Sequence, residues 1–203
     1  MHIDTTSAKN LQNTVCECLN MRYYNLVDEL GKLYDIRNEK YGEVLNEQIR
    51  KLTTSCTLNL PDEIEFYHLG WRLNGDENAE GKNLRELVLS QNSFSNYLEK
   101  HGVTFSNDGL MNVFYKGNEI LKPFDKDAGY LRDRLGMDNE YQDYCVNGFA
   151  FRDSLETVDY WKDLRWGPEF LLMLSQYTKD MSLIEDYRKN GKYYCFKYIE
   201  KAL

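Results

Sequence analysis

The sequence predicts an α+β fold: a long N-terminal helix or helical hairpin, followed by a mixed domain with a small antiparallel sheet and flanking helices. Apolar residues recur at steps of three and four over residues 8–52, which is the period of a helix. Residues 103–121 contain short β-forming segments separated by glycine-containing turns, which is typical of an antiparallel meander. We therefore expect a helical arm at 1–60 and an α+β domain at 61–203, divided near Pro61.

The arm carries one apolar stripe at helical spacing. Its members include Val15, Leu19, Tyr23, Leu26, Leu30 and Leu33. Gly31 and Gly42 are the interior breakers, so we expect either one long helix or two helices that meet near Gly42. The stripe approaches a heptad repeat, which permits a homodimer through the N-terminal helix, although packing on its own domain is the first expectation.

The first half of the domain alternates strands and helices. Residues 63–69 alternate as a strand does, with Ile64, Phe66 and His68 on one face. Residues 83–100 have helical spacing, as one helix or as two short helices broken around Asn92. Strands at 103–105, 110–115 and 119–121 then form the predicted meander, and 123–128 is a polar link.

The second half ends in helices and a closing strand. We expect a helix at 130–135 and a helix at 169–177 that begins after Gly167 and Pro168. Between them we expect a short strand at 144–146, with a helix from 144 through Leu155 as the alternative. Ser182 caps a further helix through Tyr187. Residues 193–199 are dense in β-forming residues and predict a strand, with a helix as the rival because 200–203 favours helix.

Charge and cysteine usage narrow the class of protein. A net charge of −8 and a pI near 5.0 argue against direct nucleic-acid binding but are compatible with binding to a basic partner surface. The chain begins without a basic, apolar leader and has no run of 18 apolar residues, so we expect no membrane insertion. An odd, scattered set of cysteines is typical of reduced thiols in the cytoplasm: Cys16, Cys18, Cys56, Cys145 and Cys195.

The sequence offers few groups for catalysis. It contains no Gly-x-Ser-x-Gly elbow, P-loop, dinucleotide fingerprint or His-Glu-x-x-His, so we expect neither a bound cofactor nor a metal site. Its acidic groupings lie in polar, turn-rich sequence, where carboxylates normally face water. Of its three histidines, His2 lies at the terminus, which leaves His68 and His101.

Three segments together resemble the opening of ADP-ribosyltransferases. They are Phe-Tyr-His-Leu-Gly at 66–70, Asn-Leu-Arg-Glu-Leu-Val at 83–88 and Gly-Val-Thr-Phe-Ser at 102–106. The resemblance implies that His68 contacts the ribose of NAD, and Glu169 is then the candidate for the catalytic carboxylate. The other interpretation is that His68 is a hydrogen-bonded residue on a half-buried strand.

The aromatic content points to a different class of function. Sixteen Tyr, nine Phe and three Trp exceed what the core of such a chain needs. Trp and Arg are enriched at interaction hot spots, and several lie together in segments that look loop-like or helix-terminal. The candidate binding residues are Trp71, Arg72, Tyr160, Trp161, Arg165 and Trp166. Their alternative role is to fill the core.

The sequence therefore predicts a non-enzymatic, acidic, intracellular protein that binds another protein. In its most specific form, this hypothesis has the protein inhibiting its partner by covering a basic, nucleic-acid-binding surface. The alternative is an NAD-dependent ADP-ribosyltransferase-like enzyme that uses His68. A third hypothesis is a homodimer with a structural role.

Overall fold

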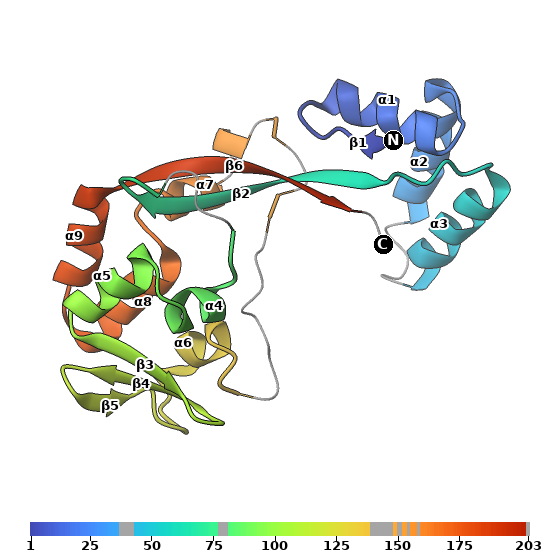
Figure 1. Ribbon diagram of the computed structural model, residues 1–203. Coiled ribbons are helices and arrows are strands. Elements are labelled where there is room, and N and C mark those ends of the chain that lie inside the picture. Colours follow the sequence, from blue (N-terminus) through green and yellow to red (C-terminus); the bar gives the residue numbers. More distant parts are fainter. Residues whose placement is uncertain are drawn as a thin grey trace. The chain divides into compact units, whose positions relative to one another are not determined.

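The protein is a mixed α+β structure, as the sequence predicts, but the described residues form two three-stranded sheets where one small antiparallel sheet was expected (Figure 1). The computed structural model describes residues 1–36, 43–76, 81–138, 148–149, 152–153, 155–157 and 159–201. The chain divides into two compact units. Unit 1 comprises Met1–Tyr67, Phe149–Leu155 and Lys197–Leu203, and unit 2 comprises His68–Gly148 and Glu156–Phe196.

The long N-terminal helix or hairpin expected at 8–52 is not shown. Its place is taken by α1 (Ala8–Cys18, only 11 residues), α2 (Tyr23–Ile36) and α3 (Glu43–Ser55). The break after α1 falls at Asn20, whose backbone is left-handed with φ of 47°. Asparagine tolerates this conformation better than most residues, and it commonly ends a helix there. The second break expected near Gly42 lies outside the described residues.

The first sheet has the strand order β1-β2-β6. β1 (His2–Ile3) runs parallel to β2 (Glu63–Leu73), with His2 opposite Glu63. β6 (Gly191–Lys201) is the other neighbour of β2, which confirms the closing strand over its helical rival. Alternation along β2 buries Glu65, Tyr67 and Leu69.

An ionic cluster surrounds the buried carboxylate of Glu65 in unit 1. The Glu65 side chain is 3 % exposed, forms an ion pair with Lys197 of β6 and lies 3.6 Å from Nε2 of His2. The Thr5 hydroxyl donates to the Glu65 carbonyl oxygen at 3.2 Å. The hydrogen bond to Glu65 raises the pKa of Lys197 above its usual value. Because an uncompensated buried charge costs several kcal/mol, these contacts fix β1 and this part of β6 against β2.

The second sheet is the predicted antiparallel meander, in unit 2. It consists of β3 (Val103–Asn107), β4 (Met111–Tyr115) and β5 (Asn118–Ile120). Val103 pairs with Tyr115, and Val113 pairs with Ile120. The two-residue turn between β4 and β5 has positive φ at both Lys116 and Gly117, the geometry that matches the twist of a hairpin.

Most helices of unit 2 begin and end close to the predicted positions, but no helix was predicted at 159–164. Asn92 accepts hydrogen bonds from the backbone of Phe94 and Ser95 and thereby separates two short helices, as one of the two interpretations expected. The helices are α4 (Leu84–Leu89), α5 (Ser93–Lys100), α6 (Gly129–Arg134), α7 (Asp159–Leu164), α8 (Glu169–Thr178) and α9 (Ser182–Asn190), with a short 3-10 turn at Leu155–Thr157. The strand expected at 144–146 lies outside the described residues.

No helix in the described ranges has the length and apolar character that a membrane span requires.

Unit 2 contains a contiguous hydrophobic core. Helix α8 contributes Leu171 and Leu174, which lie three residues apart on one face, and α9 contributes Leu183. All three side chains are fully buried. The Tyr97 hydroxyl of α5 donates to the Leu183 carbonyl oxygen at 2.6 Å, and burial raises the pKa of Tyr187 to about 12. The core therefore joins α5 and the strands of the meander to α8 and α9.

We predict that Leu174→Ala lowers the free energy of unfolding by about 2–5 kcal/mol, because it removes a fully buried side chain and leaves a cavity. Leu110→Ala is the matched control, because Leu110 is 75 % exposed and its loss changes stability by no more than about 0.5 kcal/mol. Urea denaturation followed by circular dichroism measures both. Equal losses in the two variants would contradict the assigned core.

Asp180 gives unit 2 a defined acid sensitivity. Its carboxylate accepts hydrogen bonds from the hydroxyls of Tyr115 (2.5 Å) and Ser182 (2.6 Å), and these bonds hold its pKa well below the usual range. A depressed carboxyl pKa contributes stability that is present above the pKa of the unfolded state and is lost as pH falls through the folded one. We predict that Asp180→Asn costs about 1–3 kcal/mol at pH 7 and flattens the fall in stability between pH 5 and pH 2. Denaturation at these pH values measures the effect, and exposed Asp127→Asn, the control, leaves the profile unchanged.

Candidate functional site

Two of the candidate tryptophans pack inside unit 2 instead of forming a surface. The rings of Trp71 on β2 and Trp161 on α7 both contact Tyr193 of β6, with centroid distances of 5.9 and 5.3 Å. Nε1 of Trp71 donates to the Leu164 carbonyl oxygen at 2.8 Å. Trp71 was expected in a loop-like segment, and that expectation is wrong because β2 continues past Gly70 to Leu73.

Arg72 is also engaged within unit 2. Its guanidinium lies 4.6 Å from the centroid of the Phe196 ring on β6, and Nη1 donates to the Trp71 carbonyl oxygen at 3.0 Å. These contacts give Arg72 a packing role in the sheet.

Two of the remaining candidates, Arg165 and Trp166, form an exposed surface together with Arg188, which was not a candidate. We name these three residues the tryptophan patch. Trp166 follows α7 and is 62 % exposed. The guanidinium carbon of Arg188, on α9, lies 5.0 Å from the centroid of the Trp166 ring, which is cation–π geometry. Arg165 and Arg188 are both exposed. The patch therefore presents an exposed aromatic ring with the positive charge of Arg188 beside it, and Arg165 directly precedes Trp166 in the chain.

The backbone beneath the patch is fixed by Gly167. Its φ of +134° lies in a region that side chains disfavour, and a Cβ there would collide with Cδ1 of Ile184 in the core. The Trp166 amide donates to the Asp163 carbonyl oxygen at 3.0 Å, and the Gly167 amide donates to that of Leu164 at 3.3 Å. The turn that carries Trp166 is thus packed directly on the core.

The remaining predicted residues lie on separate elements. His68 is on β2, on the same face as Gly70, where a Cβ would lie 3.0 Å from Nε2 of His68. Glu169 is in the first turn of α8, where a carboxylate interacts favourably with the helix dipole. The backbone of Tyr160 belongs to α7, and its side chain lies outside the description.

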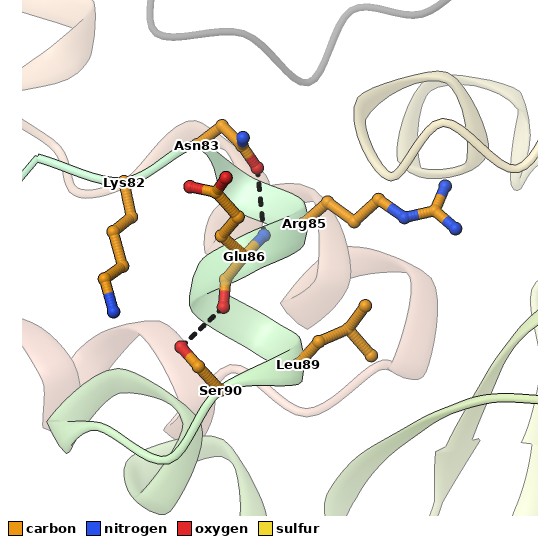
Figure 2. Close-up of a pocket in the computed structure, with 6 residues that line it drawn as sticks. All are labelled: Lys82, Asn83, Arg85, Glu86, Leu89 and Ser90. Atoms are coloured by element: carbon orange, nitrogen blue, oxygen red, sulfur yellow. Dashed lines mark hydrogen bonds between the residues drawn. The ribbon is translucent and has the colours of Figure 1, made fainter.

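A shallow hollow of about 470 Å³ lies beside α4 (Figure 2). It is lined by Lys82, Asn83, Arg85, Glu86, Leu89 and Ser90. The Asn83 side chain accepts from the Glu86 amide, and the Ser90 hydroxyl donates to the Glu86 carbonyl oxygen, so both groups cap α4. All lining residues come from one short segment that includes neither His68 nor Glu169. This hollow therefore adds nothing to the transferase hypothesis.

Sequence reasoning missed two exposed residues. Arg188 was not a candidate, because only the fold brings it over Trp166. Phe124, in the segment expected to be a polar link, is fully exposed on a left-handed backbone with φ of 67°. The Tyr177 hydroxyl pins this turn by donating to Asp125 at 2.6 Å. An aromatic residue directly after Pro123 was the available signal.

Comparison with known proteins gave no match, whether with family models, with curated proteins or with solved structures. In the described part of the chain, no group of three or more His, Cys, Asp or Glu side chains is placed to hold a metal ion. The tryptophan patch is therefore the candidate site, because its exposed ring and the arginine beside it are both described.

We predict that Gly167→Ala lowers the free energy of unfolding by about 1–3 kcal/mol, because the new Cβ meets Ile184 on a backbone that disfavours side chains. Gly109→Ala is the control, because Gly109 also has positive φ, at +85°, but has open space around it. The control isolates the backbone contribution of about 1 kcal/mol. Thermal and urea denaturation of both variants measure the difference, and equal losses would show that the turn is not packed on Ile184.

Proposed function

We propose that this protein is a non-enzymatic binding protein that engages another protein through the tryptophan patch. The observation that carries the proposal is the exposure of Trp166, 62 %, together with the Arg188 guanidinium stacked on its ring. Tryptophan and arginine dominate interaction hot spots because they bury a large area in contact with a partner.

The geometry of the patch supports binding because it is already ordered. The turn at Gly167 is held by the core, and the Arg188 contact contributes about 0.5–1 kcal/mol towards one orientation of the Trp166 ring. A side chain that is ordered beforehand loses less entropy when it enters an interface. The patch therefore favours a partner that offers an apolar recess for one indole ring.

Two kinds of charge indicate the chemistry of the partner: the arginines of the patch, which act at contact distance, and the net charge of the chain, which acts at long range. At contact distance, Arg165 and Arg188 favour carboxylates around the recess. At long range, the net charge of −8 favours approach by a protein that is basic overall, including one that binds nucleic acid. Once held by the patch, a protein with a net charge of −8 would inhibit such a partner by repelling the nucleic acid.

We predict that affinity capture from lysate with the tagged protein recovers a stoichiometric partner, and that Trp166→Ala reduces recovery at least tenfold. Removing a hot-spot side chain typically costs about 2 kcal/mol or more, which corresponds to that factor. Phe124→Ala is the matched control, because it removes a fully exposed aromatic side chain elsewhere in unit 2. Equal recovery by wild type and Trp166→Ala would refute the patch as the binding site.

The same capture, repeated with NAD, separates binding from catalysis. Intact-mass spectrometry of the recovered partner is expected to give its unmodified mass. A partner heavier by one ADP-ribose unit, with the increment lost in His68→Ala, would instead support the transferase hypothesis.

A further inference from the structure

Helix α2 in unit 1 exposes most of the large apolar side chains that the structure describes on it. Among its described side chains, Leu26 is buried, whereas Tyr23, Tyr24, Val27 and Leu30 are between 46 and 84 % exposed. A surface helix normally turns its apolar stripe towards the core and its polar residues towards water. We name these four exposed residues the α2 face. Such a face is expected to be covered by a partner in solution.

The imbalance extends to the whole of unit 1. Within the described ranges, its buried hydrophobic residues are four: Cys18, Leu26, Tyr67 and Leu155. Within the same ranges, ten large hydrophobic side chains of unit 1 are exposed, whereas unit 2 buries seventeen hydrophobic residues and exposes six large ones. A folded segment that buries so little apolar surface is marginal without an added contact.

We propose that the α2 face binds the α2 face of a second copy of this chain, so that the protein forms a homodimer through unit 1. Tyr23, Val27 and Leu30 are separated by steps of four and three, which is the spacing of a coiled-coil seam. A seam with this spacing is complementary to another helix that carries the same spacing. A two-fold axis presents such a helix without requiring a different partner.

Charge favours a second copy at this position. Residues 1–60 carry eight acidic and seven basic residues, so nearly all of the net charge of −8 lies in the rest of the chain. Two copies of an acidic protein repel each other least where their surfaces are neutral. On α2 itself, Lys32 pairs with Glu29 at 2.5 Å, whereas Asp28 and Asp35 add two further negative charges to the helix.

The expected dimer is weak. Helix α2 has 14 residues and is therefore about 21 Å long, so a helix pair buries less than the ~1,200 Å² of a standard interface. We expect dissociation in the micromolar range, and an equilibrium that shifts strongly with protein concentration.

Sedimentation equilibrium of the purified chain over about 1–300 μM tests the proposal directly. Wild type is expected to rise from its monomer mass of 24.1 kDa towards twice that value. Val27→Asp places a charge on a position that is 46 % exposed and is expected to remain monomeric, with at least a tenfold weaker association. Leu110→Asp is the matched control, because Leu110 is 75 % exposed in unit 2, and it is expected to dimerise like wild type.

Several outcomes would overturn the proposal. A wild-type chain that stays monomeric throughout would do so, and so would a dimer that Val27→Asp leaves intact. A monomer in which Val27→Asp lowers the melting temperature would show that another part of the same chain covers the α2 face. Circular dichroism of Val27→Asp at low concentration, where wild type is also monomeric, confirms that the variant folds. Because no other protein is needed, these results are independent of the tryptophan patch, and Trp166→Ala is expected to leave the mass unchanged.

Discussion

The packing of α8 and α9 into the core of unit 2 is the interaction on which the rest of that unit depends. Leu171, Leu174 and Leu183 are fully buried, and the turn before α8 rests on Ile184 of the same core. Removing apolar surface from water supplies most of the stabilisation of a domain, and it also fixes whatever is attached to the buried elements. The tryptophan patch owes its geometry to this core, because Trp166 precedes α8 and Arg188 belongs to α9.

Unit 1 is held together around a buried charged group instead of a large apolar core. Its strands are joined around Glu65, a buried carboxylate that pairs with Lys197 and lies near His2, and a polar centre of this kind adds less stability than apolar packing. The apolar side chains that would normally form its core are largely on its surface, with Leu26 of α2 as an exception. One chain thus combines a unit that completes its own core with a unit whose helices retain an unburied apolar face. The two units suit the two proposed contacts: unit 2 holds the tryptophan patch in a fixed geometry, and unit 1 exposes the α2 face to a second copy of the chain.

Local sequence signals predicted the elements that are stabilised locally. The meander, the break at Asn92 and the helix that begins at Glu169 depend on turn and cap residues within a few positions. The long helix expected in the arm was wrong because the apolar period continues across Asn20. Only the left-handed backbone at Asn20 shows that the apolar stripe is divided between two helices. Burial of Glu65 and the approach of Arg188 to Trp166 arise between residues far apart in the chain, so no local pattern could indicate them. Of the candidate binding residues, burial distinguished Trp71, which packs on Tyr193, from exposed Trp166.

Hydrogen–deuterium exchange of the free protein at two concentrations tests most directly the claim that the apolar core is unequally divided. Amides of α8 are expected to exchange slowly and independently of concentration, because they open only when unit 2 unfolds. Amides of α2 are expected to exchange fast when the chain is dilute, and more slowly when it is concentrated and the α2 face is covered. Equal, concentration-independent protection of α2 and α8 would contradict the account, since unit 1 would then be as completely packed within its own chain as unit 2.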